Sequence, residues 1–120
     1  MRWLIWLLVL VAGCGSATSV GGVFTLDEFT VDGPHMVSEG TTSLEISNAG
    51  DFNHTLVITD ADGNALAATE VVAHGSDTAL SIELLPGSYQ VSCRLVGKDP
   101  EGNIIDHYEL GMFSQLKIEG

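Results

Sequence analysis

The sequence contains 120 residues, which is enough for one domain of ordinary size. Four Lys and Arg residues stand against sixteen Asp and Glu residues, so the formal net charge is -12. A surface this acidic repels phosphate backbones, which excludes nucleic acid as an expected partner, and it attracts a partner protein with a basic docking face.

Residues 1–13 have the pattern of an export signal. Arg2 supplies a positive charge, an apolar run follows over residues 3–11, and small residues precede Cys14. The apolar run is far shorter than the roughly 20 residues that cross a bilayer as a helix. The pattern resembles a bacterial lipobox and predicts a lipoprotein signal peptide over residues 1–13, cut before Cys14, whose sulfur then carries a lipid. The alternative is an uncleaved N-terminal helix with an incidental cysteine.

Small and polar residues follow the predicted signal. Residues 15–22 read G-S-A-T-S-V-G-G, which is the composition of a flexible tether. We therefore predict a lipidated Cys and a tether over residues 14–22, and a folded domain over residues 23–120. The lipid on Cys14 would anchor this domain to the extracytoplasmic face of a membrane in the cell envelope, on the periplasmic or extracellular side.

Residues 23–120 consist of short runs in which apolar and polar residues alternate, separated by turn residues such as Pro86-Gly87. The segment 65–72 has some helical propensity but no apolar stripe, so we interpret it as a loop with one helical turn. About seven to eight short strands without a long helix predict an all-β fold, namely an antiparallel Greek-key β-sandwich. The alternating runs cover residues 24–31, 43–46, 80–84, 89–93 and 113–118, and a short, mostly apolar and β-branched run covers residues 55–59, as in a core strand.

Cys93 is the thiol that remains once Cys14 is assigned to the lipid. By alternation its side chain points inward, to the same face as Tyr89 and Val91. An unpaired thiol in an oxidising compartment is reactive unless a metal or another group holds it. Cys93 is therefore either a metal ligand or a small buried apolar residue.

A thiol, an imidazole and a thioether lie near the C-terminus, in Cys93, His107 and Met112. His54 offers a second imidazole, because it begins a distant strand and the ends of neighbouring strands meet at one pole of a sandwich. A single metal ion that takes all three kinds of donor is most naturally copper, with two imidazoles and a thiolate in one plane and a weak axial thioether. Zinc and a metal-free domain are the alternatives.

The chain contains Asn48-x-Gly50-x-x-x-His54, then Leu85-Pro86-Gly87-Ser88-Tyr89, then Cys93, then His107-x-x-x-Gly111-Met112. In this order the motifs resemble those of the cupredoxins, the small type 1 (blue) copper proteins, and the resemblance covers residues 23–120. It implies a cupredoxin-like sandwich with one type 1 copper ion. The implied ligands are the imidazoles of His54 and His107, the thiolate of Cys93 and the axial thioether of Met112.

The resemblance also implies a single-electron carrier, with copper cycling between Cu(II) and Cu(I). Electrons would pass through an exposed edge of His107 to a redox partner protein. The candidates for an apolar patch around this edge are Phe52, Leu110 and Met36. We expect a monomer. We also expect no enzymatic activity, because the sequence lacks a His-Cys-His tripeptide and a second copper domain that would form a multicopper centre. The alternatives are a copper-handling protein for storage or delivery, and a metal-free interaction domain.

The stretch between Cys93 and His107 is longer than in the familiar small cupredoxins. The residues from Lys98 to Asn103 are polar and turn-forming, which predicts a solvent-exposed excursion that leaves the ligands in place. His35 follows a proline and His74 precedes a glycine, so we interpret both as surface loop residues without a role in the site.

Overall fold

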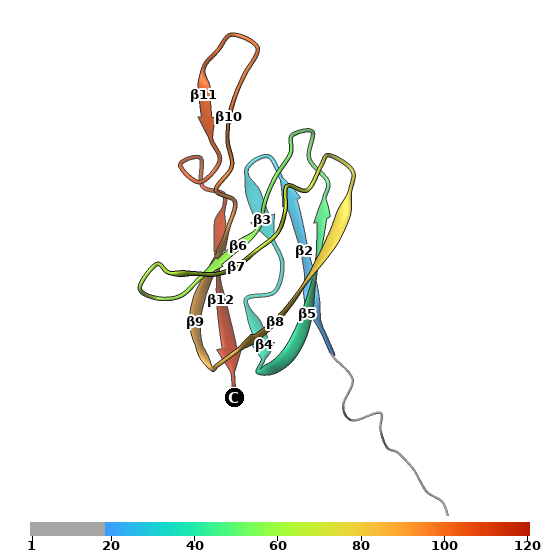
Figure 1. Ribbon diagram of the computed structural model, residues 1–120, viewed down its shortest axis with the longest axis vertical. Coiled ribbons are helices and arrows are strands. Elements are labelled where there is room, and N and C mark those ends of the chain that lie inside the picture. Colours follow the sequence, from blue (N-terminus) through green and yellow to red (C-terminus); the bar gives the residue numbers. More distant parts are fainter. Residues whose placement is uncertain (1–18) are drawn as a thin grey trace, which may run out of the picture.

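The computed structural model describes residues 19–120, which form eleven β-strands and no helix (Figure 1). Within this range, no helix has the length and apolar character that crossing a membrane requires. The predicted signal peptide, the lipidated Cys14 and the first part of the tether lie outside the described residues. The strands are β2 (Ser19–Asp27), β3 (Thr30–Asp32), β4 (Met36–Ser38), β5 (Gly40–Asn48), β6 (Val57–Thr59), β7 (Ala65–Ala68), β8 (Asp77–Leu84), β9 (Gly87–Ser92), β10 (Val96–Lys98), β11 (Ile104–Asp106) and β12 (Phe113–Glu119).

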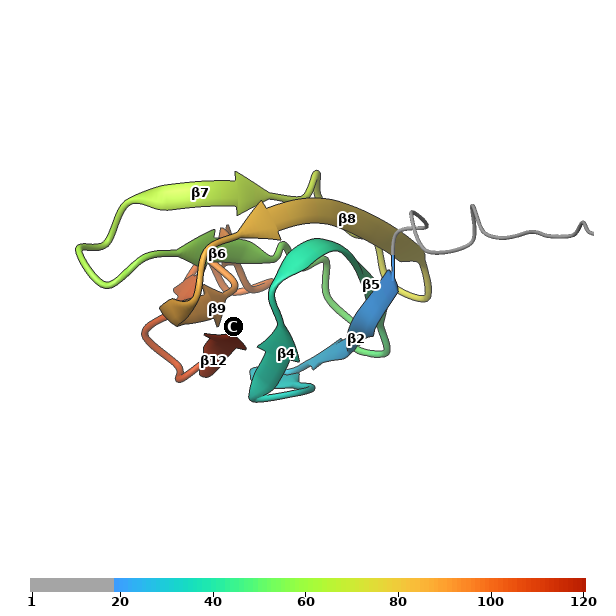
Figure 2. The same cartoon turned by 90° about the horizontal axis from the view of Figure 1, so that it is seen from below.

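Two main sheets face each other, as the two views in Figures 1 and 2 show. One sheet has the strand order β3-β2-β5-β8 and the other β4-β12-β9-β6-β7. The predicted β-sandwich is therefore confirmed. Two pairings, β2 with β5 and β4 with β12, are parallel and not antiparallel as expected. They arise because β3 lies in the first sheet and β4 in the second, so the chain crosses between the sheets before β5 returns.

The core lies between the sheets and consists of the inward-facing residues of alternating runs. Phe24 and Leu26 in β2, and Leu44 and Ile46 in β5, are at most 1% exposed. Alternation produces this burial, because successive residues of a strand point to opposite faces. Burying one such side chain contributes ~1.5–3 kcal/mol relative to leaving it exposed. The facing sheet contributes Ile58, Val91, Leu116 and Ile118.

Two segments differ from the prediction. Residues 19–22 were assigned to the tether, but they belong to β2, which pairs with β5, so the described fold begins at Ser19. Residues 65–68, interpreted as part of a loop with a helical turn, form the strand β7 beside β6. Backbone pairing with β6 outweighs the helical propensity of the alanines, since propensity is a weak preference that tertiary contacts override.

Several strands are too short for alternation to reveal them, which explains why the described residues contain eleven strands where about seven to eight were predicted. β3, β4, β10 and β11 have three residues each. β10 and β11 form a hairpin that pairs with neither main sheet and extends beyond the sandwich (Figure 1). Residues 100–104 around its tip are exposed, so the excursion predicted over 98–103 is confirmed.

Two turns with the same hydrogen-bond pattern connect β6 to β7 and β10 to β11. The carboxylate of Asp60 accepts the backbone N–H of Asn64 at 2.9 Å, and that of Asp99 accepts the backbone N–H of Asn103 at 2.8 Å. Each Asn side chain also donates to the same carboxylate. The glycine before each Asn has a φ of 87° or 89°, a conformation that strains other residues. These donors, from Asn64 and Asn103 above all, lower the pKa of Asp60 and of Asp99.

Candidate metal centre

Three segments that are far apart in the sequence meet at one end of the β4-β12-β9-β6-β7 sheet. His54 lies before β6, Cys93 directly follows β9, and His107 directly follows β11. His54 exchanges two backbone hydrogen bonds with Val72, at 3.1 and 2.7 Å, and the N–H of Cys93 donates to the carbonyl of Met112 at 3.0 Å. The positions of these side chains are therefore set by ordered backbone.

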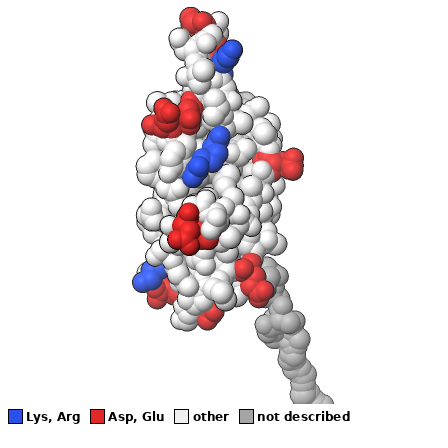
Figure 3. Space-filling view, turned by 60° about the vertical axis from the view of Figure 1, so that its left-hand side comes forward, with Lys and Arg blue, Asp and Glu red and all other residues white. Residues whose placement is uncertain are grey.

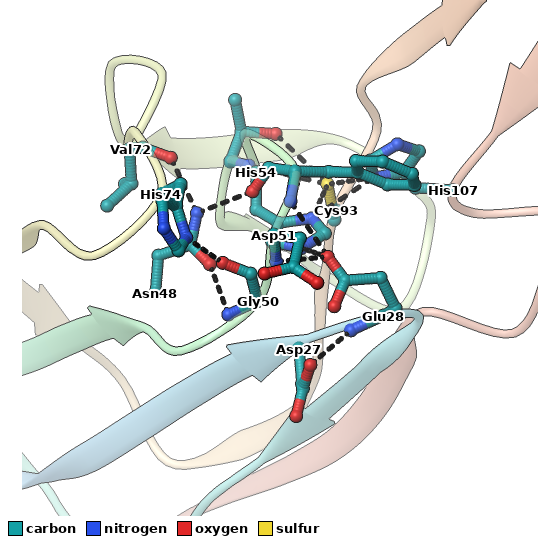
Figure 4. Close-up of polar contacts among 12 residues, drawn as sticks. Asp27, Glu28, Asn48, Gly50, Asp51, His54, Val72, His74, Cys93 and His107 are labelled. Atoms are coloured by element: carbon teal, nitrogen blue, oxygen red, sulfur yellow. Dashed lines mark hydrogen bonds and ion pairs between the residues drawn. The ribbon is translucent and has the colours of Figure 1, made fainter. Parts of the chain in front are cut away.

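The donor atoms of the three residues face one another (Figure 4). Nδ1 of His54 lies 3.1 Å from Nδ1 of His107, and Sγ of Cys93 lies 3.5 Å from the second of these nitrogens and 3.9 Å from the first. A point inside this triangle lies about 2 Å from all three atoms, which is close to the length of a metal bond to imidazole, ~2.0–2.1 Å, and slightly shorter than one to thiolate, ~2.3 Å. The three side chains are 0–3% exposed. The residues present thus fit a single metal ion.

Burial favours the neutral form of both imidazoles. Burial lowers the pKa of His54, although the carboxylate of Glu28 acts in the opposite direction. Burial also lowers the pKa of His107, and the neighbouring His54 adds to this effect. A neutral imidazole has a free lone pair, which is the form that binds a metal. The pKa of Glu28 itself is lowered: burial raises it, but the backbone N–H of Phe52, a hydrogen bond with the Asp27 side chain, the backbone N–H of Asp51 and the charge of a protonated His54 together outweigh burial.

The sulfur of Cys93 also accepts a backbone hydrogen bond from the residue next to His54. The backbone N–H of Thr55 points to Sγ at 3.3 Å, and the Thr55 hydroxyl lies 3.7 Å from it. Donors of this kind stabilise a thiolate and orient it toward a metal. Sequence reasoning missed this role of Thr55, and its position directly after a ligand candidate was the only available signal.

Met112 is tied to two of the three residues through its backbone. Its N–H donates to the carbonyl of His107 at 3.1 Å, and its carbonyl accepts from Cys93 at 3.0 Å. Its side chain is fully buried in the core. Gly111, just before it, has a φ of 98°, so the tight turn expected there requires a glycine. The backbone of Met112 is therefore bonded to two of the three donor residues, and the role of its side chain as the axial ligand stays a prediction.

His107 does not have the exposed edge that the resemblance implied. Its side chain is 3% exposed. Two aromatic rings cover it, since the ring centroid of Phe29 lies 5.1 Å away and that of Phe52 lies 6.4 Å away. Phe52 is 43% exposed and Leu110 is 54% exposed. The exposed side chain that packs against His107 is therefore Phe52, and Leu110 follows His107 three residues further along the chain.

Met36, the third residue assigned to the apolar patch, lies elsewhere. It is exposed on β4, where it pairs with Lys117 of β12. Lys117 is four residues beyond Phe113, which begins β12 next to Met112. At about 3.3 Å per residue this is roughly 13 Å along the strand. The structure therefore does not bring Met36 to Phe52 and Leu110. The sequence could not reveal this, because it does not show that β4 pairs with β12.

Asn48, the first residue of the motif before His54, is buried and fully bonded. Its Nδ2 donates to the carbonyls of Phe52 and Val72, both at 2.8 Å, and its Oδ1 accepts the N–H of Gly50 at 2.9 Å. It therefore ties the loop before His54 to Val72, which pairs with His54 on the other side. The motif contained Asn48, but its spacing alone did not reveal this function.

The two other histidines, His35 and His74, are exposed, as the sequence indicated. Nδ1 of His35 lies 3.3 Å from the carbonyl oxygen of Gln115. Nδ1 of His74 contacts the carbonyl oxygen of Gly50, as Figure 4 shows. Neither imidazole belongs to the group formed by His54, Cys93 and His107.

Comparison with known proteins relates this chain to one family. A family model described as a cupredoxin-like domain matches residues 4–105. The matched range contains His54 and Cys93 and ends before His107, so the assignment of His107 depends on the geometry above, and that of Met112 stays a prediction. Among curated proteins, no relative matches.

Solved structures with a similar fold include three proteins from different organisms. Reduced auracyanin from the photosynthetic bacterium Roseiflexus castenholzii is 18% identical over 88% of this chain and 100% of its own, with a TM-score of 0.64. Rusticyanin from Thiobacillus ferrooxidans, a copper protein, is 17% identical over 87% and 79%, with a TM-score of 0.62. A purple cupredoxin from Nitrosopumilus maritimus is 10% identical over 81% and 98%, with a TM-score of 0.53. At these identities the likeness establishes the fold.

Proposed function

This chain belongs to the cupredoxin-like family, and we propose that it is a blue copper protein that carries single electrons. The observation that supports this most directly is the buried triangle of two imidazole nitrogens and one thiol sulfur. His54, Cys93 and His107 would hold one type 1 copper ion, with Met112 as a weak axial ligand. When bound, copper would supply a one-electron couple between Cu(II) and Cu(I).

The chain's own contribution is a rigid and dry site. Backbone hydrogen bonds fix the donors, and Met112 is bonded to both Cys93 and His107. In a site that cannot rearrange, little structural change accompanies the change of charge on the copper ion. The rings of Phe29 and Phe52 cover His107 and exclude water from that side.

We place the electron exit at the exposed apolar residues Phe52 and Leu110, because the imidazole of His107 is itself buried. A redox partner would pack against these side chains. The acidic residues on the face shown in Figure 3 form separate groups and not one continuous patch. They would steer a partner with a basic docking face over some distance without fixing its orientation.

The burial of the three donors favours electron transfer over copper storage or delivery. Metal transfer between proteins needs a ligand that a partner can reach, whereas these side chains are 0–3% exposed. An electron, in contrast, crosses a few ångströms of packed side chain without any ligand leaving its place.

The location in the cell is also part of the proposal. The lipobox-like signal and Cys14 support a protein anchored by lipid to the extracytoplasmic face of a membrane in the cell envelope, with the signal peptide over residues 1–13 removed. We also propose that the protein is a monomer. Mass spectrometry of the protein extracted from membranes tests this. A mature chain that begins at Cys14 with added acyl mass is expected, and retention of residues 1–13 would contradict it.

Absorption spectroscopy tests the copper site. The purified protein with Cu(II) should show an intense blue thiolate-to-copper band that disappears on reduction and returns on oxidation. Cys93→Ala should abolish the band, whereas the control His35→Ala, which removes an exposed imidazole outside the triangle, should retain it. A colourless wild-type protein, or a band that survives Cys93→Ala, would refute the proposed function.

A further inference from the structure

Glu28 reaches from the turn between β2 and β3 into the loop before His54. Its Oε1 accepts the backbone N–H of Asp51 at 2.7 Å and that of Phe52 at 2.8 Å. Gly50 leaves the space for this carboxylate, because a Cβ at that position would lie 2.5 Å from the same oxygen. The side chain is 26% exposed, so the carboxylate is held between the loop and the site and only partly reaches solvent. The turn after β2 therefore supplies the carboxylate, and the loop before His54 supplies the two N–H donors and the space for it.

The same oxygen lies beside the second nitrogen of His54. Nδ1 of His54 faces Cys93 and His107, so a proton on this neutral ring belongs on Nε2 when Nδ1 binds a metal. Nε2 is buried and has no hydrogen-bond partner among the described residues. Oε1 of Glu28 lies 3.6 Å from it, and Figure 4 shows the carboxylate beneath the imidazole. A buried N–H favours a nearby anion, because an unpaired polar group in the interior is costly.

We propose that Glu28 is a positioning residue of the metal centre: it holds the loop before His54, fixes the His54 proton on Nε2, and lowers the reduction potential of a bound copper ion. The last part rests on the proposed function. A carboxylate behind a metal-binding imidazole makes that imidazole a better donor. A negative charge close to the site also favours the more positive oxidation state, Cu(II), over Cu(I).

The metal-free protein tests the positioning role without any assumption about copper. Glu28→Gln keeps an acceptor oxygen but removes the charge, and Glu28→Ala removes both. Hydrogen exchange should show that the amides of Asp51 and Phe52 lose protection in Glu28→Ala and keep most of it in Glu28→Gln. Nitrogen NMR should find the His54 proton on Nε2 in the wild type and shared between both nitrogens in Glu28→Ala. Unchanged exchange and an unchanged tautomer in Glu28→Ala would overturn the positioning role.

The copper-loaded protein tests the effect of the charge. Glu28→Gln should keep the blue band. It should also make the preference for Cu(I) over Cu(II) about tenfold stronger, which raises the reduction potential of the one-electron couple by ~59 mV. The control is Glu45→Gln, which removes an equal charge from an exposed position on β5 and should leave the potential near that of the wild type. Equal potentials in all three proteins would overturn this part. If the wild type takes up no copper, the proposed function fails, and the metal-free measurements still decide the positioning role.

Discussion

At the scale of single residues, the loop before His54 depends on one buried amide. Asn48 is 2% exposed and forms three hydrogen bonds within its surroundings, two as donor and one as acceptor. Asn48→Ala would leave the carbonyls of Phe52 and Val72 and the N–H of Gly50 without this partner. Buried polar groups that lose their partners are costly, so we expect the free energy of unfolding to fall by about 2–4 kcal/mol.

Urea unfolding of the metal-free protein measures this change. The matched control is Asn53→Ala in the same loop, where the side chain is exposed and a change within about 0.5 kcal/mol is expected. An Asn48→Ala protein as stable as the control would show that the loop is held by other contacts.

Residue-scale electrostatics predict a pH effect in the turn at the tip of the β10–β11 hairpin. The side-chain donor from Asn103, and next its backbone N–H, lower the pKa of Asp99 below the ordinary 3.8. The folded turn therefore favours the ionised carboxylate. Its contribution is fully present above the ordinary pKa and is lost as the pH falls through the lowered one.

Carbon NMR of the carboxyl group measures the titration of Asp99 directly. Asn103→Ala removes the main donor and should move the pKa of Asp99 up toward its ordinary value. Asp60, which has the same arrangement with Asn64 in another turn, is an internal control and should titrate as before. A shift of both groups together would indicate a general change in the protein and not the loss of this hydrogen bond.

At the scale of secondary-structure elements, the β10–β11 hairpin separates two of the metal donors in sequence but not in space. β10 and β11 pair with each other and with neither main sheet. Below the hairpin, the N–H of His107 donates to the carbonyl of Leu95 at 3.1 Å, which closes its base next to the site. The site should therefore not depend on the length of the hairpin.

Shortening the hairpin tests this independence. Gly97 pairs with Ile105, so replacing residues 98–104 with Asn-Gly leaves a two-residue turn that suits an antiparallel hairpin. We expect the blue band of the copper-loaded protein to be unchanged and the free energy of unfolding to change by less than about 1 kcal/mol. A lost or shifted band would mean that the hairpin helps to shape the metal centre.

Elements also show where sequence reasoning succeeded and where it could not. Alternation identified the runs around Ile46 and Val91, because apolar and polar residues alternate along a strand with one buried face. It failed for β7, because its alanines show no clear alternation and its strand conformation depends on pairing with β6. The donors His54, Cys93 and His107 could be predicted because their chemistry is rare in one chain. The role of Glu28 could not, since the sequence does not show that the turn after β2 folds against the loop before His54.

At the scale of the whole molecule, the metal site joins three distant parts of the chain, so binding should stabilise the complete fold. His54 leads into β6, and Cys93 and the chain after His107 lead out of β9 and into β12. The unfolded chain does not hold these donors together, so a metal binds the native state preferentially. With free copper at about 100 times the dissociation constant, the free energy of unfolding should rise by ~2.7 kcal/mol.

Calorimetry with and without copper measures this effect as an increase in the melting temperature, which a strong chelator should reverse. His54→Ala should remove most of the increase, because it deletes one of the three facing donors. His74→Ala is the matched control: it also removes an imidazole, but an exposed one that is not part of the triangle. If the wild type and His54→Ala respond equally to copper, the metal acts at other surface groups. If neither responds, the domain has the cupredoxin fold without its metal.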